Sequence, residues 1–369
     1  MIEAEPALAE RILMRLAAPE GAASSLADTI RATARAGKPI IVVGCGTSEH
    51  GALAVAAILR DANRSAGLPS SPGTGGSPLA VQALEGALEP ILGGPGAVVI
   101  GISHEGGTWA TNRALSAARD AGATVAIITA ASESPGGSVA NIVISTEEMD
   151  GSWCHTVGYL SPIIAAAAIG AHVARSAIDP MVVSALLAAS LSEATTKAVS
   201  AMAGELHDAD RLLVVGSGSD RVAARELTLK IEEGTHLPAA MRDLETLLHG
   251  HLAGVDARTG LVLILTDPVA RGARTARGLD VLRACRELGL RTGVITTPIV
   301  AEEIDPTLTP AGRILIPEAP ELPDPVASLI GTAIPLQRLT ERMAIARGIN
   351  PDPIRRDDPR YLAAADAAG

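Results

Sequence analysis

Short apolar runs alternate with longer stretches of helical pattern along most of the chain. Apolar positions at helical spacing over residues 7–36 predict N-terminal helices. After Gly37, apolar runs separated by alanine-rich stretches predict strands at 40–43, 97–100, 125–128 and 142–144, and then at 212–215, 261–265, 294–295 and 314–316. This alternation is typical of parallel sheets covered by helices.

Two similar segments indicate that the chain has two related halves. IVVGCGTSEHGALA (41–54) and VVGSGSDRVAARE (214–226) both run from a predicted strand through G-x-G-[ST] into a helix. Their spacing is far longer than a solenoid repeat, so it favours a duplicated α/β domain. We expect an N-terminal helical arm (1–37), a first domain (38–176), a helical linker (177–208), a second domain (209–347) and a C-terminal tail (348–369).

The glycine-rich turn of the first half does not fit a dinucleotide site. Glu49 takes the place of the third glycine in G-x-G-x-x-G. A Ser/Gly/Pro-rich segment (69–78) follows, where that fold places a second strand ending in an acidic residue. We expect this segment to be a loop or an irregular edge, and not a central strand.

Composition narrows the function classes. The chain has 369 residues, 47% hydrophobic content and a net charge of −11, which suits a folded protein and disfavours binding to nucleic acid. Neither a signal peptide nor a membrane span is predicted, so we expect a cytoplasmic protein without membrane contact. Cys45, Cys154 and Cys285 lie far apart, which predicts neither disulfides nor a metal site.

Two polar loops that follow predicted strands suit the binding of a small anionic ligand. The first contains Gly44, Gly46, Thr47 and Ser48 at the start of a helix, where backbone N–H groups favour an anion. The second loop presents Ser103, His104, Glu105, Gly106 and Thr108. Such turns are also common as simple tight connections, so neither loop is specific by itself.

The second half contains a candidate for proton transfer. Glu226, Lys230 and Glu233 are spaced i, i+4 and i+7, which places them on one helical face. A solvated face with salt bridges is an equally good interpretation of this spacing. His249 follows in MRDLETLLHGHLAG, and a carboxylate with an imidazole can move protons near neutral pH.

These motifs together resemble the sugar isomerase (SIS) domain family, especially the isomerase half of glutamine:fructose-6-phosphate amidotransferase and related phosphosugar isomerases and deglycases. The resemblance covers nearly the whole chain. It rests on GCGTS (44–48), SHEGGT (103–108), AARELTLKIEE (223–233) and LLHGH (247–251). It implies two flavodoxin-like, doubly wound SIS domains with N-terminal helices and a C-terminal tail.

The resemblance also implies roles for individual residues. Glu233 would transfer a proton between adjacent sugar carbons, His249 from the neighbouring subunit of a homodimer would assist ring opening, and Lys230 and Glu226 would support the site. The implied ligand is a sugar or sugar phosphate, with no cofactor and no metal. The substrate would contact Gly46, Thr47, Ser48, Ser103, His104, Glu105, Gly106, Thr108, Trp153 and His155.

Departures from the family pattern leave the reaction open. Glu105 replaces a serine near the expected phosphate, and Ala364 stands where the family tail has a lysine. We therefore expect a sugar isomerase acting through an enediol. Two alternatives are cleavage or deamination of an amino-sugar conjugate, and a non-catalytic protein that senses a sugar derivative. Arg355, Arg356 and Arg360 in the tail could supply positive charge over the ligand.

Overall fold

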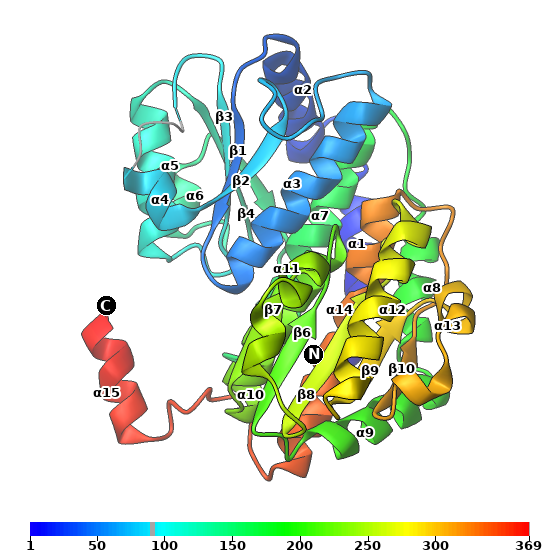
Figure 1. The fold of residues 1–369 in the computed structure, drawn as a ribbon. Helices are drawn as coiled ribbons and strands as arrows, with labels where there is room; N and C mark the ends of the chain where they lie inside the picture. Colours follow the sequence, from blue (N-terminus) through cyan, green and yellow to red (C-terminus); the bar gives the residue numbers. More distant parts are fainter. Residues whose placement is uncertain (89–92, 369) are drawn as a thin grey trace.

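The chain folds around two parallel β-sheets of five strands each (Figure 1). The computed structural model describes residues 1–88 and 93–368. The first sheet contains β1 (Ile40–Gly44), β2 (Pro78–Gln82), β3 (Val98–Ile102), β4 (Thr124–Thr129) and β5 (Ile142–Ser145). The second contains β6 (Arg211–Val215), β7 (Ala239–Arg242), β8 (Thr259–Leu265), β9 (Arg291–Thr296) and β10 (Gly312–Leu315).

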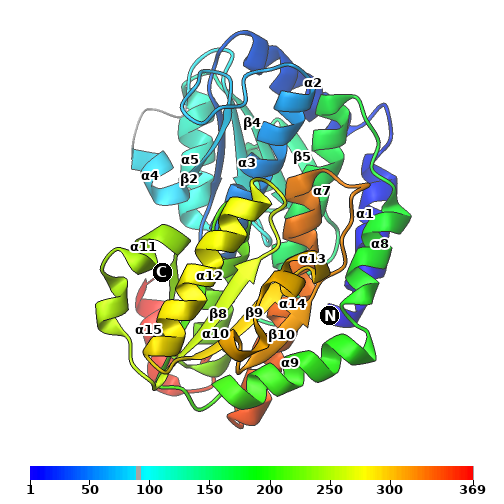
Figure 2. The same cartoon turned by 45° about the vertical axis from the view of Figure 1, so that its right-hand side comes forward.

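Helices connect the strands and cover both sheets (Figures 1 and 2). In the first half they are α1 (Glu5–Leu16), α2 (Ala22–Arg35), α3 (Thr47–Ser65), α4 (Ala83–Leu88), α5 (Trp109–Asp120), α6 (Pro135–Val139) and α7 (Val157–Ala174). Helices α8 (Pro180–Ala189) and α9 (Glu193–Leu206) lead to the second half. That half contains α10 (Asp220–Thr235), α11 (Leu244–Leu248), α12 (Arg271–Glu287), α13 (Pro298–Glu303) and α14 (Asp324–Ala346), and α15 (Pro359–Ala368) lies in the tail.

The two sheets share one strand order. The first runs β2-β1-β3-β4-β5, and the second, read from its other edge, runs β7-β6-β8-β9-β10. All neighbouring strands are parallel, and every residue of β1 and β8 is buried, as expected for apolar strands covered on both faces. The predicted fold class is therefore confirmed, and the C-terminal ends of β1 and β3 lie side by side.

The sequence pattern missed one edge strand in each sheet, β2 in the first and β7 in the second. The loop at 69–78 does not replace a second strand, because β2 begins at Pro78 and pairs with β1 at the sheet edge. Strand β7 holds the equivalent edge of the second sheet. Both strands are short and half-exposed, so they lack the continuous apolar run that identified the central strands.

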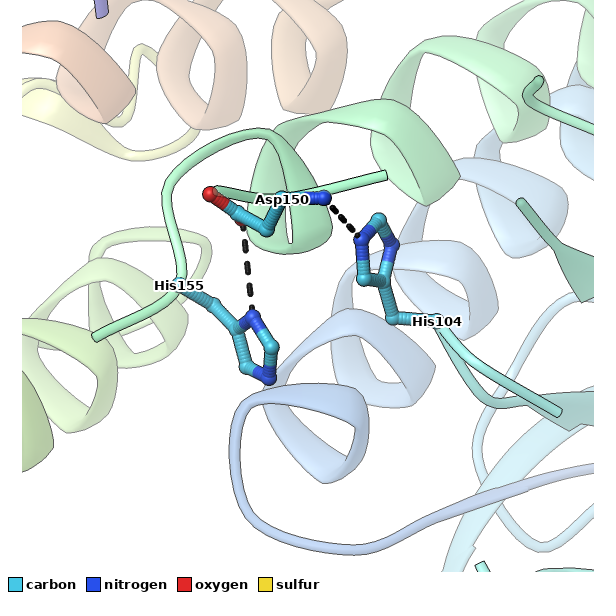
Figure 3. A group of neighbouring side chains, drawn as sticks. All are labelled: His104, Asp150 and His155. Carbon is cyan, nitrogen blue, oxygen red and sulfur yellow. Dashed lines mark hydrogen bonds and ion pairs between the residues drawn. The ribbon is translucent and has the colours of Figure 1, made fainter. Parts of the chain in front are cut away.

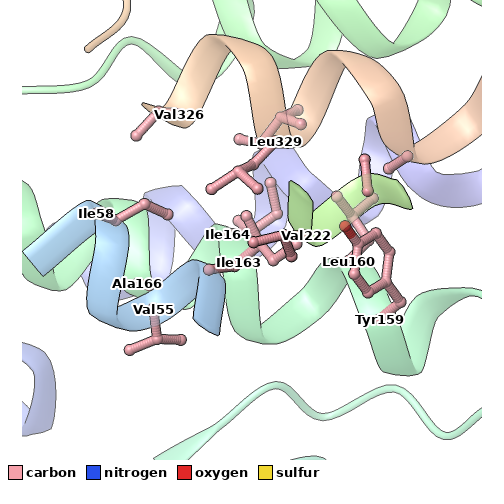
Figure 4. Packing of buried hydrophobic residues seen from close by; sticks show 14 of the residues in the cluster. Val55, Ile58, Tyr159, Leu160, Ile163, Ile164, Ala166, Val222, Val326 and Leu329 are labelled. Atoms are coloured by element: carbon pink, nitrogen blue, oxygen red, sulfur yellow. The ribbon is translucent and has the colours of Figure 1, made fainter. Parts of the chain in front are cut away.

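Helices from both halves pack against one another between the sheets (Figure 4). Val55 on α3, Ile163 on α7, Val222 on α10 and Leu329 on α14 belong to one buried cluster that extends through both halves. Helix α7 is long and apolar enough to cross a membrane, but 83% of that stretch is buried inside the protein, as in a core helix. The expected N-terminal arm also joins this core, through Leu8 and Ile12 of α1.

The C-terminal tail first contacts the first half and then extends away from the molecule. The backbone N–H of Trp153 donates to the carbonyl of Asp352 at 3.1 Å, and the Arg356 guanidinium lies 3.7 Å from the centre of the Trp153 ring. Helix α15 buries none of its residues and projects from the body (Figure 1).

Candidate active site

The first polar loop turns sharply because two of its positions require glycine. A Cβ on Gly44 would lie 2.2 Å from the carbonyl oxygen of Ser48, and Gly46 has a φ of 56°. The turn therefore brings Thr47 and Ser48 directly into the first turn of α3, whose dipole favours an anion. Thr47 is buried, whereas Ser48 and Gly46 remain partly or fully open to solvent.

The second polar loop follows β3 and is held by its own hydrogen bonds. The Ser103 hydroxyl donates to the Thr108 hydroxyl at 3.3 Å, and the Gly106 N–H donates to the Ser103 carbonyl at 3.2 Å. Gly106 has a φ of 66° and packs under Ser134. Glu105 is exposed, so its carboxylate can stay hydrated beside a bound anion.

The Glu226–Lys230–Glu233 face of α10 is buried, so the interpretation as a solvated face is wrong. The Lys230 Nζ lies 2.5 Å from Glu233 Oε2 and 3.5 Å from Glu226 Oε1. The side chains of Glu226 and Lys230 are 0% and 2% exposed, whereas Glu233 is 21% exposed. Of the three, Glu233 is therefore the group that a ligand can reach.

Burial and charge act differently on the two carboxyl groups. Burial raises the pKa of Glu233 above its ordinary value, and the Lys230 ammonium offsets this only in part. Burial also opposes ionisation of Glu226, but Lys230 and the hydrogen bond from His50 outweigh it and lower the pKa of Glu226. For Lys230, the two carboxylates outweigh burial and raise its pKa. The arrangement keeps one carboxylate and one ammonium charged beside a carboxyl group that takes up protons more readily.

Glu226 joins the two halves of the molecule. It accepts hydrogen bonds from His50 Nδ1 at 2.6 Å and from the Thr47 hydroxyl at 3.2 Å, both from the first turn of α3. Next to this contact, Arg225 donates to Glu49 at 3.0 Å. The glycine-rich turn of the first half and the charged face of the second half are therefore joined by direct hydrogen bonds.

His104, Asp150 and His155 form a polar frame beside this site (Figure 3). The Asp150 N–H donates to His104 Nε2 at 2.8 Å, and the Asp150 carboxylate accepts from the N–H groups of Thr156 and Gly158. His155 Nδ1 lies 3.5 Å from the same carboxylate. The three side chains are close enough to hold a metal ion, but the chain's own hydrogen bonds already use the His104 Nε2 lone pair and both oxygens of Asp150.

A cavity of about 370 Å³ opens next to the buried lysine. Lys230 lies on one wall, Cys154 and His155 on another, and residues of α14 and the tail segment at Asp352 complete it. Burial raises the pKa of Cys154 to about 12, so its thiol stays protonated at neutral pH. A cavity of this size is suitable for one sugar-sized molecule.

Comparisons with known proteins show what the chain and its fold are similar to. Residues 205–298 match the family model described as SIS domain. The chain is 25% identical over 361 residues to a glutamine–fructose-6-phosphate aminotransferase [isomerizing] from Pyrobaculum aerophilum, covering 94% of this chain and 55% of that protein. It therefore spans about half the length of this curated relative.

Solved structures share the whole architecture. The C-terminal domain of glucosamine-fructose-6-phosphate aminotransferase from Francisella tularensis superposes with a TM-score of 0.78 at 18% identity, covering 95% of this chain and 96% of that one. Tagatose-6-phosphate ketose/aldose isomerase from Escherichia coli has a TM-score of 0.73 at 20% identity, covering 95% and 94%. The chain contains a SIS domain, and its two five-stranded parallel sheets share the layout of these sugar-phosphate enzymes.

One predicted residue of this SIS protein lies apart from the site. His249 ends α11 and has a side chain that is 68% exposed, with Nδ1 3.1 Å from a carboxylate oxygen of Glu245. Glu245 in turn binds Arg277 of α12. Within one chain, His249 therefore belongs to an exposed cluster and not to the Glu226–Lys230–Glu233 group.

Two other predicted residues, Trp153 and His104, have contacts that define their place in the structure. Trp153 is 45% exposed and packs against Arg356, so the ring lies beneath the tail. His104 turns its Nε2 toward Asp150 and thereby positions the loop at 150–156. Ala364 lies on the exposed helix α15, apart from this tail contact.

Sequence reasoning missed His50 and Asp150 as parts of the SIS site. His50 lies three residues after Thr47 on α3, a spacing that already indicated a shared helical face. Asp150 had no comparable signal, because its partners are the buried His104 and backbone N–H groups that only the fold brings near.

Proposed function

We propose that this SIS protein catalyses aldose–ketose isomerisation of a sugar or sugar phosphate through an enediol. The observation that carries the proposal is the position of Glu233. Its partly exposed carboxyl group has a raised pKa and contacts a buried ammonium beside a sugar-sized cavity. Such a group can remove a proton from one carbon and return it to the next near neutral pH.

The two polar loops would bind the anionic end and the hydroxyl groups of the substrate. Ser48, Ser103 and Thr108 offer hydroxyl groups near the N-terminus of α3, and the exposed position of Glu105 avoids placing a desolvated carboxylate against a phosphate. The Lys230 ammonium would stabilise the negative charge that develops on the enediol oxygens. His155 offers an imidazole in the same cavity as Lys230.

Cleavage or deamination of an amino sugar is the second candidate reaction. It is favoured by the relative from P. aerophilum, which is named as an aminotransferase that also isomerises. The proton transfers at carbon would be the same, and the reactions differ by the release of ammonia or an amine. We also infer a homodimer in the cytoplasm, where the three free cysteines would stay reduced.

Solvent deuterium exchange tests the proposed chemistry directly. We expect the protein to exchange the proton next to the carbonyl of fructose 6-phosphate or tagatose 6-phosphate in D₂O, measured by NMR. Glu233→Gln should lower the exchange rate by about 10²-fold or more, because it removes the base. Ammonia measured in the same samples with glucosamine 6-phosphate separates deamination from isomerisation.

Glu232→Gln is the matched control for this experiment. It makes the same change one residue earlier on α10, where the side chain is exposed and accepts the Ala239 N–H at 3.3 Å. The control should exchange protons at the wild-type rate. Binding of the sugars without exchange or ammonia release by the wild-type protein would instead favour a sugar-sensing role and contradict the proposed catalysis.

A further inference from the structure

A second cavity lies between the two halves, apart from the proposed catalytic group. Its volume is about 600 Å³, and it is bounded by α3, the turn after β6, the loop after β8 and the start of α14. Figure 2 shows α3 above the N-terminal end of α12, which borders the same space. None of Glu226, Lys230 and Glu233 lines it.

The walls of this cavity are rich in arginine. Five of the chain's 30 basic residues line it, with only three acidic residues, although the chain as a whole carries a net charge of −11. The lining therefore has two more basic than acidic residues within an acidic protein, and its acidic partners do not neutralise all of its arginines. The five are Arg60, Arg64, Arg221, Arg225 and Arg274.

Two of these guanidinium groups retain donors for a ligand. Arg60 donates to the Pro78 carbonyl at 3.1 Å and forms no ion pair within the described part of the chain. Arg274 donates to the Ser217 hydroxyl at 2.9 Å and to the Val269 carbonyl, while its distance to the Asp267 carboxylate is 3.7 Å. Each guanidinium carries five N–H donors, so both arginines keep donors that can bind a ligand.

The cavity lies at the part of the second sheet where open parallel sheets usually bind ligands. In the second sheet, β6 has β7 on one side and β8 on the other, so the chain changes direction between β6 and β8. The cavity lies at the C-terminal ends of these two strands, which is the usual ligand crevice of such sheets. It corresponds in topology to the end of β1 and β3, where the first half carries its polar loops.

Asp267 determines how an anion could be held there. Its carboxylate accepts the Ser219 N–H at 2.7 Å and the Val269 N–H at 2.9 Å, so these two backbone donors are already used. A ligand anion would therefore lie farther out, against the guanidinium groups. Arginine is well suited to this because its planar fork binds phosphate oxygens in pairs.

We propose that this arginine-lined cavity is a second binding site, for a phosphorylated small molecule. It joins α3 of the first half to α10 and α12 of the second half, so a bound phosphate would link the two halves. The site is independent of the proposed isomerisation, because its residues lie outside the cavity beside Lys230.

Calorimetric titration of the full chain with inorganic pyrophosphate tests the site. We expect two binding sites per chain. Arg274→Gln and Arg60→Gln should each weaken one of them by about tenfold or more, since each variant removes a charge-assisted hydrogen bond. Ser103→Ala combined with Thr108→Val should weaken only the other site, in the first half. Thermal melting of each variant checks that it remains folded.

Arg258→Gln is the control for the loss of one positive charge. Arg258 is paired with Asp210 and Asp256 on the surface and lies outside the cavity, so this variant should bind pyrophosphate as the wild type does. A single site that disappears with the Ser103 and Thr108 changes, and persists in folded Arg274→Gln and Arg60→Gln, would overturn the proposal. The absence of saturable binding by the wild type would also overturn it.

Discussion

Lys230 holds its charge although its side chain is almost fully buried. Its ammonium lies between the carboxylates of Glu226 and Glu233, and Glu226 is also bound by His50 and Thr47. Such a network is stable only while each charge keeps its partners, because an unpaired buried charge has a high desolvation cost. The same network fixes the orientation of Glu233, which is the residue we propose as the base.

Removal of this lysine should be strongly destabilising. We expect Lys230→Met to lower the free energy of unfolding by about 3–5 kcal/mol, because it leaves Glu226 buried without its main counter-charge. Urea denaturation measures the loss. Lys197→Met is the control, since Lys197 pairs with Glu193 at i,i+4 on an exposed surface, where such pairs contribute about 0.5 kcal/mol or less. Equal effects of the two variants would contradict the burial argument.

A second buried carboxyl group makes stability depend on pH. Burial raises the pKa of Glu5 to about 8, although Gln337 donates a hydrogen bond to it. A carboxyl group with a raised pKa favours the folded state while it is protonated. Its stabilising effect is therefore complete below the unfolded pKa and is lost as the pH rises through about 8.

We expect Glu5→Gln to remove this loss. The wild type should lose up to about 5 kcal/mol of stability through Glu5 between low pH and pH 9, and the variant should lose much less. Melting temperatures at pH 6 and pH 9 give the comparison. Glu3→Gln, on the same segment but 81% exposed, should follow the wild type. A Glu5→Gln variant that melts like the wild type at both pH values would contradict the raised pKa.

At the scale of elements, the loop after β3 offers a paired test. Gly106 needs a positive φ, and a Cβ there would lie 1.8 Å from Ser134 Oγ, whereas a Cβ on the adjacent Gly107 meets nothing within 4 Å. Gly106→Ala should therefore distort the loop and lower stability by about 1–3 kcal/mol, while Gly107→Ala should be nearly neutral. Chemical denaturation and sugar binding of both variants measure this. If both variants behave alike, the loop does not depend on this conformation.

The central elements were predictable from sequence because their environment is uniform. Strands such as β3 and β8 are buried on both faces and appear as continuous apolar runs. Edge strand β7 is only half-buried, and its four residues carry no such pattern. On α10, the spacing predicted a shared face, but whether water or protein covers that face depends on α3, which docks from the other half of the chain.

At the scale of the whole molecule, the two halves complete each other. The first half supplies polar loops and His50, the second supplies Glu226, Lys230 and Glu233, and the tail adds Arg356 beside Trp153. This division explains why the sequence prediction of the site had to combine motifs from both halves. His249 is the one proposed catalytic residue that does not join this site within the chain, because it lies in an exposed cluster with Glu245. Its exposed position leaves the imidazole accessible to a second subunit.

Mixing two inactive variants tests whether His249 acts across a dimer. If the proposed dimer places His249 of one subunit beside Glu233 of the other, Glu233→Gln and His249→Ala should each abolish activity when pure. In a symmetric dimer, reassembly of an equal mixture gives mixed dimers in which one site carries both changes and the other carries neither. Activity should then recover to about a quarter of the wild type, because half of the dimers each contain one intact site. Measured isomerase activity that stays absent after reassembly, with mixed dimers verified by mass, would show that His249 does not serve the site of its partner.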